Sequence, residues 1–579
     1  MSKQHPGSSV QESVSGATPP ASSPSDTDAC IQGNVDIEFD QIQGNIFGGF
    51  LKDHQVNLLF RIDNVAKARV TLGPSDENEV AYPTGIVGHV SHSTSESVIA
   101  FNEQFRALRR AGEPEGTILA TWTNLVFTAT GVSKLEKNRA GLPAAFSEGM
   151  LKRAETIGDI DIADPKAGHL ANGPSHWNDN MDVIVKWEEV DGMLLVASDD
   201  PGQLDRFRVN SRLANYLAKL EASDSGITIL GIIRGKTRMD AGPDQVGHEH
   251  FGFKDGVSQP GIRGVDAPDD PLHNPDQGDP GQDLLHPGEF VLGYPTQIGH
   301  AGPGPESPNP CQGPLSGKGL PDWVKNGSFL VFRRLAQDVK GFREAVSKNA
   351  AALGITTDLM GAKLVGRYVS GAPLEALKFQ AGTGEYEPPM TDPGLANPAL
   401  ANSNALNNDF EYGEDVDGSI VPLAAHIRKA YPRDHVPFKG GRPSTEKEHI
   451  DAESFTQTHR LLRRGIPFGP SLGASEGGGP DVPRGLLFFA YQSDIERQFE
   501  FVQQQWVNAP NFPEQHAGQD PIITSNTSKG AIEGCPFHPR ADRSKCPVAF
   551  KHFVKTRGGG YFFSPSIDTL KRWLTAPGA

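Results

Sequence analysis

The chain has 579 residues, which exceeds one ordinary domain and allows two hydrophobic cores. Its formal net charge is −17, from 54 lysines and arginines against 71 aspartates and glutamates, and no basic block could neutralise a phosphate backbone. These numbers exclude a nucleic-acid partner. The longest apolar runs are strand-sized, so a transmembrane helix and a membrane partner are not expected either.

Residues 1–36 are rich in Ser, Pro and Gly and lack the apolar core of a signal peptide. This composition predicts a disordered N-terminal tail and a cytoplasmic location. The four cysteines, at positions 30, 311, 535 and 546, are too few and too scattered for a disulfide framework. Unpaired thiols in surface loops are the favoured interpretation. A bridge between Cys535 and Cys546, or a metal clip that includes His538, are the alternatives.

Strands and helices are predicted in both halves of the chain. Those of the first half are a strand within 39–62, a helix over 101–112, a hairpin of strands 181–187 and 192–198 around Asp191–Gly192, and a buried strand over 227–235. Those of the second half are a strand over 328–335, a helix with Leu335, Val339, Phe342 and Val346 on one face, a strand over 485–491, and a helix with a capping box from Ser493 to Glu496 that buries Ile495, Phe499, Val502 and Trp506. This pattern predicts two α+β halves, each an antiparallel sheet with helices on one face.

Two stretches interrupt the predicted elements. Residues 266–322 and 373–420 are too rich in Pro, Gly, Asn and Asp to form regular elements. They are expected to be surface insertions around the core.

The stretch HEHFGFKDGVSQPG, residues 248–261, has three interpretations. Asp255–Gly256 taken alone favours a tight turn, as at the other Asp-Gly pairs. His248 and His250 could be two metal ligands on alternate positions of a strand, but they lack the i, i+4 spacing of helical zinc sites and no third ligand is suggested nearby. The third interpretation is a loop that directs one carboxylate at a ligand.

The third interpretation is favoured because the string resembles the distal loop of the dye-decolorising peroxidases, a haem enzyme family with a GxxDG pattern. Further similar stretches are IQGNI at 42–46, LMGAKLVGRYVSGAPL at 359–374, PLAAHIRKAYPR at 422–433, THRLLRRGIPFGP at 458–470, and the strand, helix and closing strand of the C-terminal region. The resemblance extends over about residues 39–573 and is to the large subgroup that includes fungal enzymes.

The resemblance implies a haem b cofactor (iron protoporphyrin IX), with His426 as the proximal ligand of the iron. Asp255 is implied as the base that moves a proton of hydrogen peroxide, and Arg463 as the positive charge that stabilises the leaving oxygen. Arg463 is implied to contact haem as well. Its neighbour Arg464 is expected to point away, because successive strand residues face opposite sides.

Three more residues complete the expected haem site. Leu486 and Phe488, rather than Leu487 and Phe489, are expected to form a wall of the distal pocket. Asp520 is the expected carboxylate partner of the proximal histidine, which would make the imidazole more anionic.

The fold implied by the resemblance is α+β, with two ferredoxin-like domains and haem in the C-terminal half. Its predicted divisions are the first domain at 37–265 with the GxxDG loop, the insertion at 266–322, and the haem-binding domain at 323–579. The implied function is reduction of hydrogen peroxide coupled to one-electron oxidation of dyes and phenolic or other aromatic compounds. Bulky dyes would be oxidised at a surface Trp or Tyr.

Two other functions remain open from the sequence. A haem carrier with little peroxidase turnover would need His426 but not Asp255 or Arg463. A metallohydrolase would use His248 and His250. The oligomeric state is left open.

Overall fold

The computed structural model describes residues 36–73, 85–111, 118–161, 172–242, 245–271, 274–297, 320–377, 388–436, 443–473, 482–525 and 550–575. The predicted N-terminal tail lies outside these residues except for Asp36, and so do all four cysteines. Within the described ranges, no helix is both long enough and apolar enough to cross a membrane.

The first half contributes four antiparallel strands to one sheet. They are β1 (His54–Ile62), β2 (Thr121–Phe127), β3 (Gly192–Ser198) and β4 (Ile227–Lys236), in the spatial order β4-β1-β3-β2. Helices connect β1 to β2 and β3 to β4. β3 lies between β1 and β2, and β1 lies between β3 and β4, so each connection passes over one strand. This order is that of a ferredoxin-like unit, as the sequence predicts.

The second half repeats the arrangement. Its strands are β7 (Ser328–Gln337), β8 (Leu462–Arg463), β9 (Ile466–Phe468), β10 (Gly485–Gln492) and β11 (Val554–Ser564), in the order β11-β7-β10-β8, with β9 also paired to β10. The two units join edge to edge where Phe563 of β11 pairs with Phe127 of β2, which makes one nine-stranded sheet. One core cluster includes side chains from both units, and the division into two domains stays a prediction.

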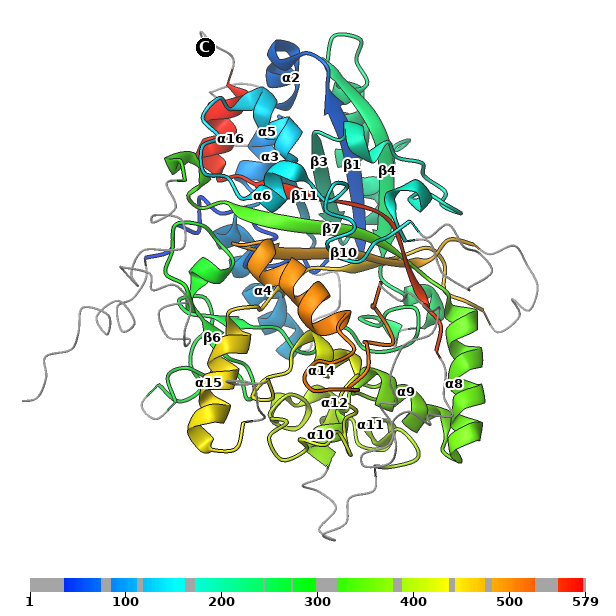
Figure 1. Ribbon diagram of the computed structural model, residues 1–579. Coiled ribbons are helices and arrows are strands. Elements are labelled where there is room, and N and C mark those ends of the chain that lie inside the picture. Colours follow the sequence, from blue (N-terminus) through cyan, green and yellow to red (C-terminus); the bar gives the residue numbers. More distant parts are fainter. Residues whose placement is uncertain are drawn as a thin grey trace, which may run out of the picture.

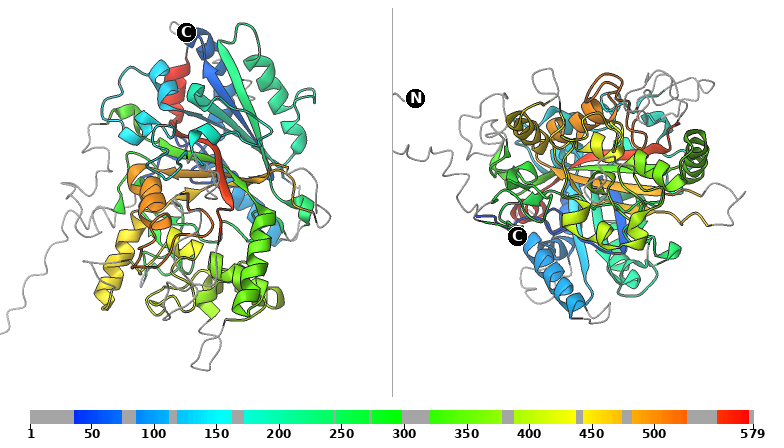
Figure 2. Two further views of the ribbon diagram at one scale, coloured as in Figure 1. Left: turned by 45° about the vertical axis from the view of Figure 1, so that its right-hand side comes forward. Right: turned by 90° about the horizontal axis from the view of Figure 1, so that it is seen from below.

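Helices cover the sheet and build a lower layer (Figures 1 and 2). Those of the first half are α2 (Val65–Leu72), α3 (Ile86–Ser91), α4 (Ser95–Arg110), α5 (Ala129–Leu135), α6 (Ala144–Glu148) and α7 (Arg212–Leu220). Those of the second half are α8 (Val339–Leu353), α9 (Thr357–Val365), α10 (Leu374–Leu377), α11 (Pro393–Ala396), α12 (Ala399–Asn402), α13 (Asn404–Asn407), α14 (His426–Ala430), α15 (Glu446–Gln457) and α16 (Ile567–Leu574). Figure 1 shows α8 to α15 below β7 and β10, with the first-half strands above them.

The predicted hairpin around Asp191–Gly192 is wrong. Residues 181–187 form no strand, and β3 pairs with β1 and β2, strands far from it in the sequence. The Asp191 carboxylate accepts a hydrogen bond from the backbone N–H of Ile62 at 2.7 Å and pairs with Lys134. Asp191 therefore anchors the start of β3 to the end of β1 instead of turning a local hairpin.

The helix after β10 begins at Glu496, two residues later than a cap at Ser493 predicts. It is π-helical over Glu496–Glu500 and Val502–Val507. The Asp494 carboxylate, and not the Ser493 hydroxyl, accepts from the backbone N–H groups of Glu496 and Arg497. The Glu496 side chain instead accepts from the backbone N–H of Ala145 at 2.8 Å.

The two predicted insertions are partly core rather than surface. In 266–322, β6 (Leu284–Leu285) pairs in parallel with β5 (Gly261–Ile262), which precedes the stretch. β6 is followed by Glu289–Leu292, all of which are fully buried. In 373–420, an apolar cluster forms around Leu374, Phe410 and Tyr412. Short regular elements do form in both stretches, β6 in the first and α10 to α13 in the second. The prediction of surface insertions without regular elements is wrong for these parts because scattered apolar residues between the prolines and glycines pack into the core.

Candidate active site

A cavity lies between the second-half strands and the lower layer of helices. Its volume is about 270 Å³, which is much more than one ordered water occupies and is enough for a ligand. Alternate residues of the strands face it, because side chains alternate along a strand. These lining residues are Arg333, Leu335 and Gln337 of β7, Leu486 and Phe488 of β10, Arg463 of β8, and Val554 and Thr556 of β11.

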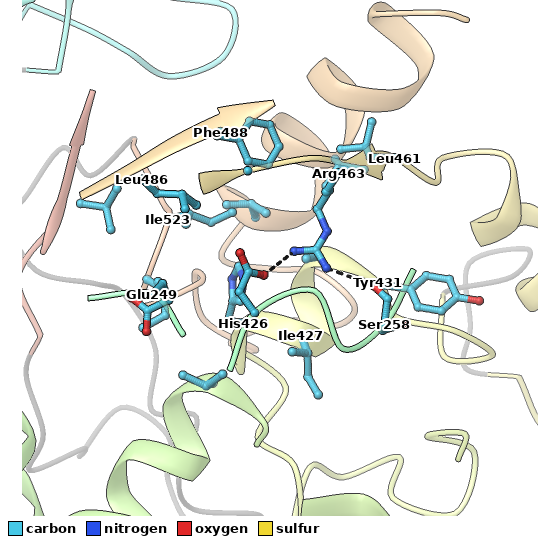
Figure 3. A pocket seen from close by; sticks show the side chains of 18 of the residues that line it. Glu249, Ser258, His426, Ile427, Tyr431, Leu461, Arg463, Leu486, Phe488 and Ile523 are labelled. Carbon is cyan, nitrogen blue, oxygen red and sulfur yellow. Dashed lines mark hydrogen bonds and ion pairs between the residues drawn. The ribbon is translucent and has the colours of Figure 1, made fainter. Parts of the chain in front are cut away.

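Asp255 and Arg463 meet in this cavity, although 208 residues separate them. Arg463 Nη1 lies 3.0 Å from Asp255 Oδ1, and Arg463 Nη2 donates to the Ser258 carbonyl at 3.0 Å. Figure 3 shows the guanidinium group of Arg463 extending from its strand toward Ser258, with Phe488 above and His426 below. Both side chains keep about a third of their surface exposed, so each can reach a small ligand.

The loop that carries Asp255 turns at two glycines. Gly252 has φ +108° and Gly256 has φ +73°, in the region that side chains with a Cβ rarely adopt. Nothing lies within 4 Å of a Cβ built at either position. These glycines are therefore required by backbone conformation and not by close approach of another protein group.

His426 and Asp520 form the second pair at the cavity. His426 begins α14 and lines the cavity, and its Nδ1 lies 2.8 Å from Oδ2 of Asp520. Asp520 is fully buried, and its other oxygen accepts from the backbone N–H groups of Ile522 and Ile523. Burial disfavours the imidazolium, but the Asp520 charge and hydrogen bond outweigh burial and raise the pKa of His426 above its usual value. Among the described residues, His426 Nε2 has no hydrogen-bond partner and is available to a ligand.

The alternation along β10 separates cavity wall from core. Leu486 and Phe488 line the cavity, whereas Leu487 and Phe489 are fully buried in the main core. Arg464, next to Arg463, points the other way and donates to the carbonyls of residues 45–47 at 2.8 to 3.1 Å.

The HEH triplet does not form a metal site. His250 Nε2 lies 2.8 Å from the Phe468 carbonyl, and His248 Nε2 lies 3.1 Å from the Val369 carbonyl. Throughout the described ranges, no three His, Cys, Asp or Glu side chains are placed to hold a metal ion. The two histidines instead attach the Asp255 loop to neighbouring segments.

Sequence reasoning missed the charge of the cavity wall. Six basic side chains and two carboxylates of the described residues line it: Lys254, Arg333, Arg367, Arg433, Arg460 and Arg463 against Glu249 and Asp255. Burial, with the positive charge of Arg433, lowers the pKa of Arg367 to about 9. Three of the arginines pair with carboxylates outside the wall, Arg333 with Asp159, Arg433 with Glu411 and Arg460 with Asp283, which balance most of this charge. The guanidinium N–H groups in the wall still offer donors to an anionic ligand. The only signal in the sequence was a set of arginines that resembles ordinary surface charge.

Haem fits this arrangement. A flat, largely apolar group with two carboxylates matches apolar walls from Leu486, Phe488 and Ile427 combined with guanidinium groups that can donate to carboxylates. The His426 nitrogen that is free of protein partners is a suitable ligand for iron, and its other nitrogen is bound to a carboxylate, as in many metal sites. Asp255 and Arg463 lie in the same cavity and can serve a proton transfer to a small ligand.

Surface oxidation sites are scarce in the described part of the chain. Five of the six tryptophans are buried, and Trp122 is half-buried. Of the described tyrosines, Tyr431 alone is not fully buried; it lines the cavity with its ring 3.6 Å below the guanidinium of Arg460. A relay through a surface Trp or Tyr stays a prediction.

Three comparisons place these observations among known proteins. The profile of a family described as "DyP dimeric alpha+beta barrel domain" matches residues 41–238. Dye-decolorizing peroxidase msp1 of Mycetinis scorodonius is 30% identical over 565 residues, which cover 94% of this chain and 90% of that protein. A deferrochelatase of Yersinia pestis is 37% identical over 169 residues, 29% of this chain and 25% of that protein.

A solved structure shows the same likeness in three dimensions. A dye-decolorizing peroxidase in complex with 2,6-dimethoxyphenol has a TM-score of 0.64 and 25% sequence identity to this chain. The match covers 92% of this chain and 99% of the other. The likeness therefore includes both ferredoxin-like units and the segments around the cavity.

Proposed function

This chain belongs to the dye-decolorising peroxidase family, and on that premise we propose that it is a haem peroxidase that uses hydrogen peroxide to oxidise dyes and phenolic compounds. The observation that supports the proposal best is the position of two functional pairs in one cavity. Asp255 with Arg463 can manage a proton and a negative charge, and His426 with Asp520 can hold iron.

Haem b is the form of the cofactor that we propose. The sequence has no CxxCH motif for covalent attachment, so the group would be held by His426 and by contacts with the cavity wall. Leu486 and Phe488 would contact its apolar face. Arg433 and Arg460 are the candidates to bind its carboxylates, because both line the cavity from the side of α14 and β8. When bound, haem supplies the iron at which peroxide is reduced and the oxidising equivalents that the dyes and phenols consume.

Asp255 would accept a proton from one oxygen of hydrogen peroxide and return it to the other, which leaves as water. The negative charge that develops on this leaving oxygen would be stabilised by Arg463, whose guanidinium is held between Asp255 and the Ser258 carbonyl. Asp520 would keep His426 oriented, with its Nε2 free to bind and its Nδ1–H donated to the carboxylate.

The competing function is a haem carrier, and similarity to a deferrochelatase over 29% of the chain makes it worth testing. A carrier has no need of a distal acid-base pair. The decisive comparison is wild type against Asp255→Asn, both loaded with haemin and mixed with hydrogen peroxide and a phenol.

We expect both proteins to show a Soret band and wild type to oxidise the phenol. Asp255→Asn should keep the band and lose turnover by about 10²- to 10⁴-fold, the usual contribution of a positioned base. No turnover in wild type would contradict the peroxidase proposal and favour the carrier. Equal turnover in the two proteins would instead refute the role of Asp255 as the base.

A further inference from the structure

Glu249 lies inside the loop that ends at Asp255 and lines the same cavity (Figure 3). Its carboxylate accepts hydrogen bonds from the backbone N–H groups of Phe251 at 2.8 Å and Phe253 at 2.9 Å. The side-chain amide of Gln337, on β7, donates to it at 2.5 Å. The Glu249 carboxylate is therefore the acceptor for three N–H groups from two separate segments.

The backbone of Glu249 completes this bonding. Its N–H donates to the Phe253 carbonyl at 3.0 Å, and its carbonyl accepts from Gly252 N–H at 3.0 Å and from Arg238 Nη1 at 2.6 Å. Every N–H from residue 251 to 253 thus ends on Glu249. These bonds fix residues 251–253 to Glu249 from within the loop, whereas His248 and His250 attach the loop to segments outside it.

The fixed loop leads directly to the reactive carboxylate. Asp255 N–H donates to the Gly247 carbonyl at 2.9 Å, which closes the loop two residues before Glu249. The rings of Phe251 and Phe253, which also line the cavity, pack on Phe342 of α8, with the first pair stacked at 4.3 Å between ring centroids. The backbone of Asp255 is therefore held between an apolar anchor outside the loop and a carboxylate inside it.

A glutamate at this position has no close substitute. Both oxygens of the carboxylate are used as acceptors. Glutamine would turn its NH₂ group toward one of the three N–H donors, and an unsatisfied donor or a donor-donor clash inside a loop is costly. The charge is tolerated because the donors face it; burial nevertheless raises the pKa of Glu249.

We propose that Glu249 is the positioning residue for Asp255: its carboxylate sets the conformation of residues 249–255 and so the distance between Asp255 and Arg463. The proposal rests on the peroxidase function proposed above. Glu249 itself does not exchange a proton with peroxide. Its loss is expected to move the base and leave the reductant site unchanged.

The test is Glu249→Gln, with Glu289→Gln as the matched control. Glu289 is fully buried, accepts from the backbone N–H of Gln297 at 2.8 Å and pairs with Arg497, and it lies outside the cavity. Both variants make the same chemical change and should lower the temperature of unfolding. The rate constant with hydrogen peroxide should fall on the order of tenfold to a hundredfold in Glu249→Gln only, because a base displaced by about 1 Å loses that much.

Two further readouts separate positioning from general damage. Glu249→Gln should leave the KM for the phenol within about twofold of wild type, because the loss is confined to the step that needs Asp255. In haem-free protein, hydrogen–deuterium exchange should become about tenfold faster or more in the peptide that contains residues 249–255, and should not change there in Glu289→Gln.

A milder variant covers the case in which Glu249→Gln does not fold. Gln337→Met removes one donor and leaves both backbone bonds, so the peroxide rate constant should fall on the order of twofold to fivefold with faster exchange in the same peptide. Unchanged peroxide kinetics in the folded variants, or an equal loss in Glu289→Gln, would overturn the proposal. If wild type binds haemin but ignores peroxide, the proposed function fails, whereas the exchange result in haem-free protein still decides the role of Glu249.

Discussion

Asp520→Asn is the most direct test of the proximal pair, His426 with Asp520. In the wild-type chain the fully buried Asp520 carboxylate lies 2.8 Å from His426 Nδ1 and also accepts from Ile522 N–H at 2.7 Å and Ile523 N–H at 3.1 Å. Asparagine keeps the shape, but its one oxygen cannot serve both the imidazole and the two backbone groups. One charged hydrogen bond is lost, which is worth about 1.5 to 3 kcal/mol.

Three consequences follow from that loss. The haem-free variant should unfold with a free energy lower by about 1.5 to 3 kcal/mol in denaturant titrations. The affinity for haemin should fall on the order of tenfold to a hundredfold, which is the usual effect of removing the partner of a metal-binding histidine. The reduction potential of the loaded protein should rise, because a less anionic imidazole stabilises ferric iron less well.

Asp415→Asn is the matched control. Asp415 is also buried and accepts from two backbone N–H groups, those of Ile420 and Val421, and from Arg428. It should lose stability like Asp520→Asn and keep the wild-type reduction potential. If Asp520→Asn binds haemin with wild-type affinity and potential, the hydrogen bond to His426 does not tune the ligand, and the reasoning on the proximal pair is refuted.

Three further predictions follow from the described contacts. Arg463→Met should abolish peroxide turnover with little loss of stability. Arg464→Met should instead lower the free energy of unfolding by about 2 to 4 kcal/mol and leave turnover per folded molecule unchanged. Identical results for the two variants in thermal unfolding and phenol oxidation would refute these assignments. Burial, with the negative charge of Asp283, raises the pKa of Glu453 from 4.5 to about 7 in the folded protein. The folded state therefore holds this proton more tightly than the unfolded state, and the protein loses stability as the pH rises from 4.5 to about 7. Glu453→Gln should therefore match wild type at pH 4 and exceed it by about 1 to 3 kcal/mol at pH 8, and an equal gain at both values would count against this explanation. His248→Ala should leave haemin binding intact and change no metal content, whereas loss of a bound metal ion from the purified protein would revive the metallohydrolase hypothesis.

The sequence predicts the repeated unit well and its connections less well. Strands at 227–235, 328–335 and 485–491 are confirmed within a residue or two, because apolar runs and alternation are local properties. The error at 181–187 arises where Asp-Gly invites a hairpin but the tertiary structure provides better partners for β3. Strand pairing between distant segments leaves no trace in a local pattern.

The site shows the same limit. Asp255, Arg463 and His426 stand out because each is flanked by several residues of a family motif. Glu249 lies within the same motif, yet a lone glutamate beside two histidines gives no hint that its carboxylate binds the backbone two and four residues further on. The arginines that line the cavity are also invisible as a set, because residues 367, 433 and 460 come together only after folding.

Gln259 explains how the first half of the chain fixes a residue of the second. β8 is two residues long and is the last strand of the sheet, so one edge of Arg463 has no strand partner. The Gln259 side chain takes that place: its Nε2 donates to the Arg463 carbonyl at 3.1 Å, and its Oε1 accepts from Arg463 N–H at 3.3 Å. A side-chain amide thus continues the ladder at a sheet edge, which would otherwise present unpaired groups. Because Gln259 lies four residues after Asp255, the same loop that carries the base also sets the backbone position of its arginine partner.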